Sequence, residues 1–574
     1  MAKNTSLARI LSVIIFAMVC IKISVGQTTF YVDPAFSGTR NGSASKPWQS
    51  LSDNVSPSPW SSINAALANG PVTVYFSACN TTCTANTVTA TALAINRTDT
   101  GTNRLTLDGI SQYNTSESSP AWVSNVTPAP CTGFRCAASQ TWSTAPHFQI
   151  GVAGTGVDDP ISSNATFDNC QGYITVQGFR VYRSNDQVMN LTYIHDLTVQ
   201  YNEGSAVPGG STGPGVYVGP ANNGPCHTGA ARPNGTDSGP DNVTVQYNYI
   251  HDTYEDNFYD GASTGDPPGY GGSEYTTLNL NCTTACSTGA NHLIQYNTFE
   301  SSADAGGTEN EGIDIKDGHA SLQIIGNTIR PTLAATTPNA IGPGINLESG
   351  GLISGNYIEA PMTVAIAAQI GWNNKVGRSS LTVENNIIVN VNTNAGHNSG
   401  IEVFSSSYSE ATQLWQAVGI YDNTLYNVGN VAGYPCIVLD PAISPSAVAI
   451  VQNNIMANCD AGAAGFTASP GTLATHSNNL YYQATALNGA SCSGSEPGVV
   501  CSNPQFVSTG TPYEDVNFAL QAGSPAIGAG ANLSSVFTTD YFGSTRTVPW
   551  DMGAIGGTSG GPPNPPTALV VTVD

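Results

Sequence analysis

Short runs of alternating apolar and polar residues recur along most of the chain, and each run ends in a similar way. Two or three alternating residues precede a polar pair that ends in Asn, and an aliphatic or aromatic residue follows shortly after, as in VQYNYI, LIQYNTF and VQNNIM. Alternation at period two, with many Val, Ile, Thr and Tyr residues, is typical of strands rather than helices. The Asn residues of these units are Asn248, Asn297, Asn327, Asn356, Asn386, Asn423 and Asn454, and Asn202 and Asn479 extend the series.

The regular spacing of these units predicts a solenoid. Most copies follow one another at about 30 residues, and a fixed period with insertions is the signature of stacked coils. Each coil alone exposes an apolar face that only the next coil covers. We therefore predict an all-β fold, a right-handed parallel β-helix, with the Asn residues aligned along one edge. Asn suits such a turn because it tolerates left-handed backbone, and stacked Asn side chains form ladders.

A second strand lies between the Asn turns. Its copies read GVYV, GIDI, GINL and GIEV, at residues 215–218, 312–315, 344–347 and 400–403. Because side chains alternate across a strand, the aliphatic pair of each copy points inward and the residue between them points outward. These outward residues are Tyr217, Asp314, Asn346 and Glu402. They predict one solvent-exposed face, on which we expect Tyr217, Asn346 and Glu402 to bind substrate.

The pattern changes at both ends of the chain. Residues 1–26 combine early basic residues, a short apolar run and small residues at their end, which is typical of a signal peptide and predicts an extracellular protein. We expect an N-terminal cap with first coils at 27–130, the parallel β-helix at 131–505 and a capping segment at 506–557. Residues 558–574 contain PPNPP and are interpreted as a linker.

Each end also resembles known proteins. The strand, short helix and strand expected over residues 30–76 resemble the opening of many extracellular β-helix proteins, in which the helix covers the first coil. The segment from Asn503 to Ala554 resembles the terminal segment of bacterial β-helix proteins of the choice-of-anchor type. The resemblance implies a capped solenoid with an N-terminal capping helix.

Composition narrows the classes of partner and compartment. The chain has 16 basic and 39 acidic residues, a net charge of −23, and no cluster of Lys or Arg, which argues against nucleic acid as a partner. After the leader no apolar run is long enough to span a membrane. Thirteen cysteines, of which Cys20 lies in the leader, leave an even number for pairing in an oxidising compartment. Close pairs such as Cys492 and Cys501 are interpreted as loop staples.

The densest charged stretch runs from residue 309 to residue 318. Its carboxylates are Glu309, Glu311, Asp314 and Asp317. Carboxylate oxygens are the ligands that Ca²⁺ prefers, so we predict a Ca²⁺ site here. Lys316 shares the outward face of the strand with Asp314, and Arg330 follows the next Asn turn. We expect Lys316 and Arg330 to be the catalytic residues, with Lys316 as base and Arg330 stabilising charge.

The pattern Glu311-Gly312-Ile313-x-x-Lys316 resembles a segment of family nine polysaccharide lyases, within the pectate-lyase-like superfamily. In that family the Lys removes the proton α to a uronate carboxylate, and Ca²⁺ held by Asp residues neutralises that carboxylate. The resemblance therefore implies a carbohydrate-active β-helix protein that cleaves an acidic polysaccharide by β-elimination. The chain departs from the family in one respect, because the Asp cluster expected in a neighbouring coil is represented only by Glu255, Asp256 and Asp260.

Other interpretations of these residues stay open. Glu348 occupies the position that matches Lys316 one coil later, so a cross-coil ion pair would explain both residues without catalysis. A hydrolase with paired carboxylates would use Asp256 and Asp260, although the motifs of polygalacturonases and the Asp-Pro-His tripeptide of mannuronan epimerases are missing. The alternative function is a non-catalytic glycan-binding or cell-surface protein, because fold alone does not define function.

Overall fold

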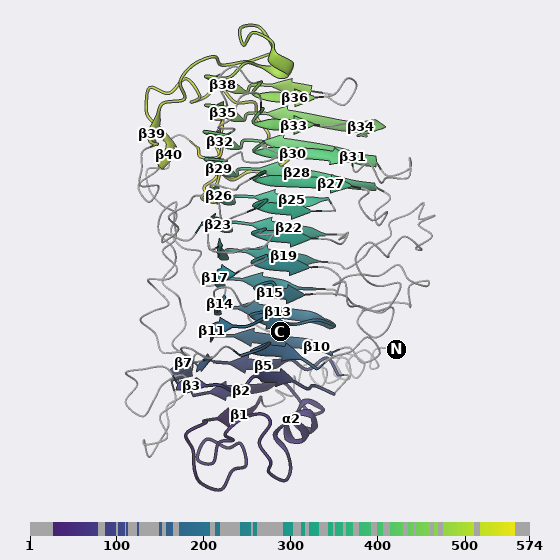
Figure 1. Ribbon diagram of the computed structural model, residues 1–574. Helices are drawn as coiled ribbons and strands as arrows, with labels where there is room; N and C mark the ends of the chain where they lie inside the picture. The colour runs from purple at the N-terminus through teal and green to yellow at the C-terminus, as the bar shows by residue number, and fades with distance from the viewer. Residues whose placement is uncertain are drawn as a thin grey trace, which may run out of the picture.

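The computed structural model describes the following residues: 27–77, 87–98, 101–109, 111–112, 123–124, 148–151, 157–164, 171–206, 213–218, 242–253, 256–260, 291–301, 311–315, 321–331, 342–347, 350–359, 363–370, 378–391, 399–405, 414–428, 434–439, 443–459, 464–468, 475–509 and 517–556. Within these ranges the chain winds into an elongated stack of coils (Figure 1). Three long parallel sheets of 13, 12 and 11 strands run along the stack, so the predicted right-handed parallel β-helix is confirmed.

The three sheets are called A, B and C, in the order in which each coil visits them. Sheet A consists of β1 (Thr28–Val32), β2 (Val72–Phe76), β5 (Leu105–Asp108), β10 (Gln171–Gln177), β13 (Ile194–Gln200), β16 (Thr244–Gln246), β19 (His292–Gln295), β22 (Leu322–Ile325), β25 (Gly351–Ser354), β28 (Arg378–Glu384), β31 (Leu414–Tyr421), β34 (Ile443–Gln452) and β37 (Thr475–Ser477). Sheet B consists of β3 (Thr87–Thr89), β8 (Phe148–Ile150), β11 (Phe179–Ser184), β14 (Glu203–Ala206), β17 (Tyr249–Thr253), β20 (Thr298–Ser301), β23 (Thr328–Pro331), β26 (Tyr357–Glu359), β29 (Ile387–Val389), β32 (Thr424–Tyr426), β35 (Ile455–Ala457) and β38 (Leu480–Tyr482). Sheet C consists of β4 (Leu93–Ile95), β9 (Ile161–Ser163), β12 (Met189–Asn190), β15 (Val216–Val218), β18 (Phe258–Asp260), β21 (Ile313–Ile315), β24 (Ile345–Leu347), β27 (Ile366–Ile370), β30 (Ile401–Ser405), β33 (Ile437–Leu439) and β36 (Phe466–Ala468).

The inward positions of successive strands are in register and fill the coil with one continuous apolar core. In sheet C, for example, Ile313 pairs with Ile345 and Ile315 pairs with Leu347, and all four side chains are fully buried. Each coil alone would expose this row, so the next coil buries it on stacking. The predicted alternation, with the aliphatic pair inward, is therefore confirmed for sheet C.

The Asn row forms the edge between sheets A and B, as predicted. The Asn297 amide donates to Asn327 Oδ1 at 2.9 Å, and the Asn327 amide donates to Asn356 Oδ1 at 3.0 Å. The pattern continues from Asn202 to Asn479, where Glu496 Oε1 accepts the last amide at 2.9 Å. All nine ladder residues are as follows: Asn202, Asn248, Asn297, Asn327, Asn356, Asn386, Asn423, Asn454 and Asn479.

The expectation that the ladder Asn itself takes the left-handed backbone is wrong. The residue before it does so, for example Tyr247 with φ 56° and Gly326 with φ 63°. The turn needs one left-handed residue to change direction, and this position carries Tyr, Gly, Asn or Asp in different coils. The ladder Asn is conserved in type along the stack because its amide must reach the coils on both sides, not because of its φ angle.

The N-terminal end carries the predicted capping helix, α2 (Pro59–Leu67). Ser58 is its N-cap, with Ser58 Oγ accepting from the backbone N–H of Ser61, and Pro59 occupies the first helical position, as is usual for helix starts. Ile63 and Leu67 are fully buried against the first coils. The helix thus covers the open end of the core beside β1 and β2 (Figure 1).

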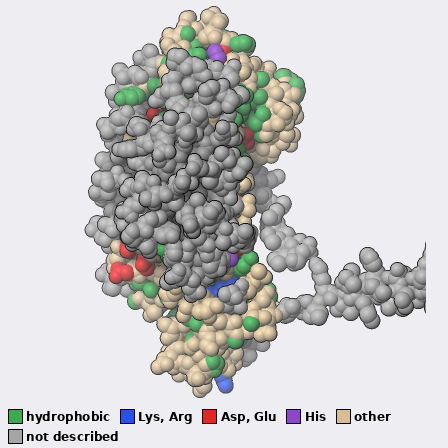
Figure 2. All heavy atoms as spheres, turned by 90° about the vertical axis from the view of Figure 1, so that its right-hand side faces the viewer, with side chains coloured by type: hydrophobic (Ala, Val, Ile, Leu, Met, Phe, Trp, Pro, Cys, Tyr) green, Lys and Arg blue, Asp and Glu red, His purple; other side chains and the backbone are tan. Residues whose placement is uncertain are grey.

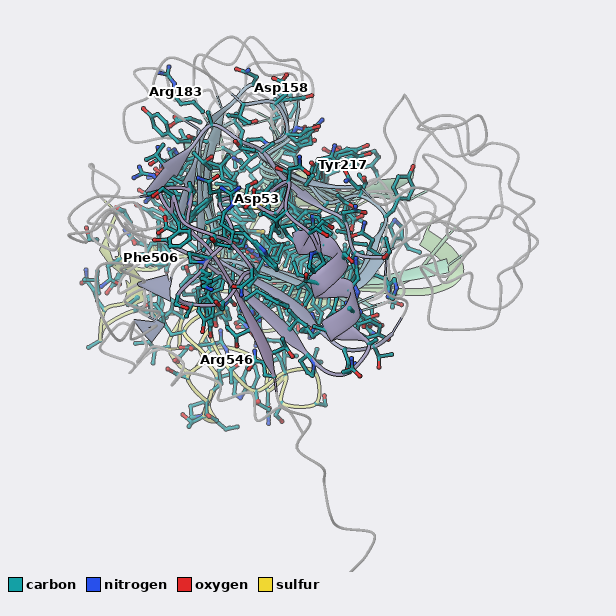
Figure 3. The ribbon with its side chains drawn as sticks, turned by 90° about the horizontal axis from the view of Figure 1, so that it is seen from below. Asp53, Asp158, Arg183, Tyr217, Phe506 and Arg546 are labelled. Atoms are coloured by element: carbon teal, nitrogen blue, oxygen red, sulfur yellow. A yellow bond between two sulfur atoms is a disulfide. The ribbon has the colours of Figure 1, made fainter. Side chains whose placement is uncertain are left out.

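The C-terminal segment lies along the side of the stack rather than only across its end. The antiparallel pair β39 (Phe506–Ser508) and β40 (Asn517–Leu520) and the residues up to 556 pack against the outer face of sheet B. The residues of sheet B in this contact are Tyr357, Ile387, Val389, Ile455, Ala457 and Leu480. Seen along the axis, Phe506 and Arg546 lie on the side of the coil away from Tyr217 of sheet C (Figure 3). The described part of this segment therefore lies on sheet B and not on sheet C.

The remaining described features are short. They are the 3-10 helix η2 (Leu487–Gly489) and the small antiparallel pair β6 (Ser111–Gln112) and β7 (Val123–Ser124). The predicted staple Cys492–Cys501 is a disulfide, and a second disulfide, Cys436–Cys459, joins neighbouring coils. Among the described residues no helix is long and apolar enough to cross a membrane. The predicted signal peptide and linker lie outside the described residues.

Candidate functional site

Connection lengths single out sheet C as the place for a site. Strands of sheets A and B are joined by tight turns at the Asn ladder, for example between Gln246 and Tyr249. From β10 to β38, the longest connections between successive described strands, residues 219–243 and 261–291, follow β15 and β18 of sheet C instead. Long insertions on a rigid scaffold are where binding and catalytic residues concentrate. The outer face of sheet C is accordingly the first place to look for chemistry.

The outward residues of sheet C form one row, as predicted. Asp314 is in register with Asn346, and the row runs from Tyr217 through Tyr259 to Glu402. The expectation that these side chains project into solvent is wrong for three of them, since Asp314, Tyr217 and Asn346 are 0%, 6% and 8% exposed. Alternation along a strand fixes which way a side chain leaves the sheet, but not what packs beyond it. Glu402 is half-buried, as is Tyr259 of the same row.

Three carboxylates converge beside β18 and β21 of this row. Asp256, Glu311 and Asp314 are buried, and each offers an oxygen atom within 4.8 Å of the others. Backbone register brings them together: Asp256 and Glu311 both lie two residues before an inward core residue of successive strands. The backbone N–H of Glu311 donates to Asp256 Oδ1 at 3.1 Å, and the Asn346 amide donates to Asp314 Oδ1 at 3.1 Å.

The electrostatics of this cluster favour a cation. Three buried carboxylates this close repel one another when ionised, and burial penalises each charge further. Glu311 is 6% exposed, and its Oε2 atom has no hydrogen-bond partner. A buried, unsatisfied carboxylate oxygen directed into an all-oxygen donor set fits Ca²⁺, which takes six to eight oxygen ligands. The residues present therefore fit the predicted ion, with Asp256 added to Glu311 and Asp314.

The other predicted residues fall elsewhere. Glu309, Lys316 and Asp317, together with Glu348 of the alternative ion pair, lie outside the described residues. Arg330 is described, and the structure does not bring it to this face. It lies on β23 of sheet B, where Arg330 Nε donates to Glu300 Oε1 at 2.7 Å and both side chains are buried. An Asn turn and a change of sheet therefore separate Arg330 from Asp314.

Arg330 belongs to a charged network on the outer face of sheet B. Glu300 also accepts a hydrogen bond from the Tyr249 hydroxyl at 2.8 Å. Nearby, His251 faces Asp252 at 2.8 Å and Glu203 at 3.6 Å. Burial alone would lower the pKa of His251, but its hydrogen bonds to Asp252 and Glu203 outweigh burial and raise the pKa to about 9. Positive and negative groups alternate here, which is the arrangement of a structural ion-pair network.

The sequence analysis did not place Asp256 in the acidic cluster, and it did not predict that Asp260 lies inside the coil. The signal for Asp256 was present, because Asp256-Asn257-Phe258 and Glu311-Gly312-Ile313 occupy equivalent positions of successive coils. Asp260 points into the coil, where Asp260 Oδ2 lies 2.7 Å from His292 Nδ1 and neither side chain is exposed. Asp256 therefore lies in the acidic cluster and Asp260 inside the coil, so the structure does not group the two carboxylates that the hydrolase alternative would use.

Charge on the described surface is sparse. On the face shown in Figure 2, the coloured Asp and Glu side chains gather mainly in one small patch toward the N-terminal end, and the remaining described surface is largely uncharged. The acidic groups near β18 are buried instead. Three buried carboxylates within 4.8 Å of one another make this point of a charge-poor scaffold a candidate for function.

No protein-family model and no curated protein matches the sequence. Among solved structures, the A-module of the mannuronan C-5 epimerase AlgE6 of Azotobacter vinelandii is 11% identical, with 80% of this chain and 98% of that chain covered and a TM-score of 0.34. A complex of XylC with xylose is 12% identical, with 92% and 98% covered and a TM-score of 0.39. A rhamnogalacturonan lyase is 12% identical, with 74% and 87% covered and a TM-score of 0.28. None of these distant similarities assigns a function to the chain.

Proposed function

We propose that the outer face of sheet C around β18 and β21 is a Ca²⁺-assisted site that cleaves a uronate-containing polysaccharide outside the cell by β-elimination. The observation that carries the proposal is the convergence of Asp256, Glu311 and Asp314, with the Glu311 Oε2 atom buried and without a hydrogen-bond partner. A polysaccharide is an extended ligand, and the side of a solenoid offers an extended surface for it.

The residues divide the chemistry as follows. Asp256, Glu311 and Asp314 would hold Ca²⁺, which when bound offsets the negative charge that builds on the uronate carboxylate. Lys316 follows β21 directly in the sequence and is the proposed base, taking the proton from the carbon α to that carboxylate as the glycosidic bond β to it breaks. To act as the base, Lys316 must be a neutral amine. Nearby carboxylates favour its charged ammonium form unless a cation offsets their charge. Arg330 takes no part, because it is bound to Glu300.

The first test asks whether the cluster binds Ca²⁺. The full chain is heated in the presence of a chelator and then with added Ca²⁺, and binding to the folded state alone stabilises it by about 2.7 kcal/mol at 100 times the Kd. Glu311→Gln removes one charge without changing shape and is expected to abolish most of the Ca²⁺-dependent rise in Tm. Glu402→Gln, in the same outward row but three coils away, is the matched control and is expected to keep it.

The second test asks whether the site is catalytic. Pectic, alginate and glycosaminoglycan polymers are incubated with the chain, and unsaturated uronate products are followed by ultraviolet absorbance with and without Ca²⁺. Lys316→Ala is expected to abolish product formation, whereas Lys46→Ala, at an exposed lysine of the N-terminal cap, leaves it unchanged. Ca²⁺ binding without cleavage of any polymer would replace the lyase by the glycan-binding alternative. The proposal would be overturned if Glu311→Gln kept the Ca²⁺-dependent stabilisation and Lys316→Ala kept the activity.

A further inference from the structure

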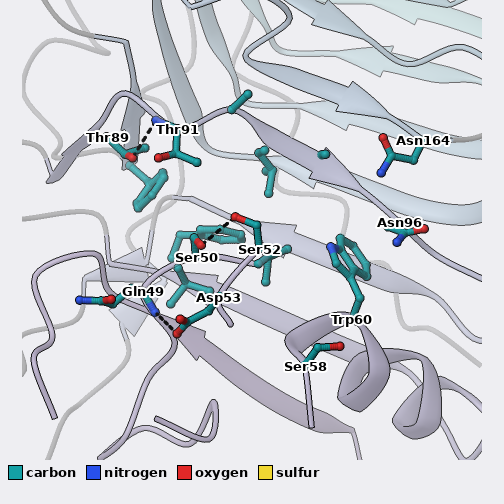
Figure 4. A pocket seen from close by; sticks show the side chains of 17 residues that line it. Gln49, Ser50, Ser52, Asp53, Ser58, Trp60, Thr89, Thr91, Asn96 and Asn164 are labelled. Atoms are coloured by element: carbon teal, nitrogen blue, oxygen red, sulfur yellow. Dashed lines mark hydrogen bonds between the residues drawn. The ribbon is translucent and has the colours of Figure 1, made fainter. Parts of the chain in front are cut away.

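A pocket opens between the N-terminal cap and the first coils, far along the stack from the acidic cluster. Its volume is about 350 Å³, within the range of roughly 300–1,000 Å³ that is usual for small-molecule sites. Residues 49–53, the start of α2, residues 89–96 around β4 and Asn164 after β9 line it, together with Val32, Phe76 and Phe148 of the first coils (Figure 4). Several coils of the β-helix separate these segments from β18 and β21 (Figure 1).

The lining of this pocket carries no uncompensated charge. Asp53 is the one charged residue among those that line it. Its carboxylate lies 2.8 Å from Arg40 Nε and accepts the backbone N–H of Gln49 at 3.2 Å. A charged ligand would therefore find no counter-ion here, and a lone, compensated carboxylate supplies no acid–base pair. The pocket suits binding of a neutral molecule rather than chemistry on it.

The walls combine an aromatic side with a hydroxyl and amide rim. Trp60 stands on the first turn of α2, partly buried and packed against the core, so its indole is held in place. In Figure 4 it rises beside Asn96, while Thr89 and Thr91 stand across the pocket. The side chains of Ser52, Thr91 and Asn96 are exposed at the rim. Deeper in, the floor is apolar, with Leu51, Phe76 and Phe148 among the described residues.

We infer that this pocket binds one neutral sugar residue, as a free monosaccharide or as a unit of a longer glycan. A sugar ring has an apolar C–H face and a polar hydroxyl edge, which match a tryptophan face and a rim of hydroxyl and amide groups. The pocket volume accommodates one ring. This inference is independent of the proposed lyase function, because it uses different residues and a different class of ligand.

The experiment is calorimetric titration of the full chain with neutral monosaccharides and their short oligomers, namely glucose, xylose, galactose and mannose series, alongside galacturonate as the charged comparison. We expect a neutral sugar to bind with one site per chain and galacturonate to bind at least tenfold more weakly. Trp60→Ala is expected to weaken binding at least tenfold, and Trp60→Phe, which keeps a ring and the packing, is expected to retain most of it. Asn96→Ala weakens binding, whereas Asn69→Ala, at an exposed Asn just after α2 that does not line the pocket, leaves it unchanged.

Two outcomes would overturn the inference. One is that no neutral sugar binds the wild-type chain, or that Trp60→Ala and Asn96→Ala both bind as the wild type does. The other is that a small apolar probe such as indole binds in a Trp60-dependent way and no sugar displaces it. Ca²⁺ stabilisation and polymer cleavage depend on Glu311 and Lys316, so failure here leaves the proposed function unaffected, and the converse also holds.

Discussion

The Asn ladder and the acidic cluster of sheet C are both rows of buried polar groups, and they differ in how well those groups are satisfied. In the ladder, Asn327 accepts from the backbone and side chain of Asn297 and donates to the Ile294 carbonyl and to Asn356. In the cluster, Glu311 Oε2 is buried without a hydrogen-bond partner beside two other carboxylates. The first arrangement stabilises the fold by itself, and the second leaves a buried carboxylate oxygen for the proposed Ca²⁺ to bind.

Under the proposed function, this difference distinguishes the structural row from the ion-binding cluster without reference to sequence motifs. A satisfied buried hydrogen bond contributes about 1 kcal/mol, whereas a buried group left without a partner costs about 1–3 kcal/mol. A row that repeats in every coil and satisfies each member reduces the free energy of the folded state. A cluster that leaves a buried group without a partner raises that free energy. Removing a polar group should therefore destabilise the folded state in the ladder and not in the cluster.

The largest effect is expected at the most deeply buried pair, Asp260 and His292 inside the coil. Both side chains are fully buried and their Oδ2 and Nδ1 atoms lie 2.7 Å apart. Asp260→Ala removes the partner of His292 in the apolar core. Breaking such a buried pair lowers the free energy of unfolding by about 3–5 kcal/mol. Urea unfolding measures it as a lower midpoint with an unchanged slope. The double variant Asp260→Leu with His292→Leu should be milder than the single change, and equal losses in both would contradict the pairing.

The ladder is tested at its middle. Asn327→Ala leaves the backbone N–H of Asn297 and the Ile294 carbonyl without their side-chain partner, so we expect a loss of about 3 kcal/mol in the free energy of unfolding. Gln323→Ala, at an exposed position of β22 in the same coil, is the control and should change stability by less than about 0.5 kcal/mol. A near-neutral Asn327→Ala would mean that the ladder does not stabilise the stack.

Sequence periodicity predicted the coils, the inward aliphatic rows and the Asn edge because these features repeat in every coil and depend on local alternation. Sequence periodicity failed for side chains whose position depends on contacts between coils. Asp256 and Glu311 come together only through the register of successive coils. Arg330 binds Glu300 on sheet B, and Asp260 binds His292 inside the coil. The left-handed residue of each turn is also set by the turn geometry and varies in type, so the Asn pattern misplaced it by one position.

A third buried polar group, where the C-terminal segment meets the stack, tests the comparison through pH. Burial raises the pKa of Asp422 to about 7, although Arg546 at 3.5 Å opposes the shift. Because the folded pKa is raised, Asp422 favours the folded state fully below its unfolded pKa near 4, and that contribution is lost as pH rises through about 7. Asp422→Asn should therefore gain on the order of 2 kcal/mol relative to wild type at pH 8 and little at pH 4.

The measurement for Asp422 is a series of urea midpoints between pH 4 and pH 8. Burial also raises the pKa of Glu384 to about 7, and Arg546 lies near this carboxylate as well, so part of the pH dependence should remain in the Asp422→Asn variant. Glu402→Gln serves as the control, since its profile should follow the wild type. If Asp422→Asn lost the same stability at every pH, the carboxylate would act only through its hydrogen bond from Asn453.

The smallest effect, and the one with the opposite sign, is expected at Glu311 in the presence of a chelator. Glu311→Gln removes one of three neighbouring buried charges, so the repulsion falls and the folded state should be unchanged or up to about 1 kcal/mol more stable than wild type. Asn327→Ala is destabilising under the same conditions, although both changes remove polar character from a buried site. With saturating Ca²⁺ the order reverses for Glu311→Gln, because the wild type gains the binding free energy and the variant does not.

Urea midpoints of the two variants with and without Ca²⁺ therefore give a crossing pattern for Glu311 and parallel shifts for Asn327. A Glu311→Gln variant that is destabilised in chelator as strongly as Asn327→Ala would show that Glu311 is a structural group, and the distinction between satisfied and unsatisfied polar rows would not hold for this protein.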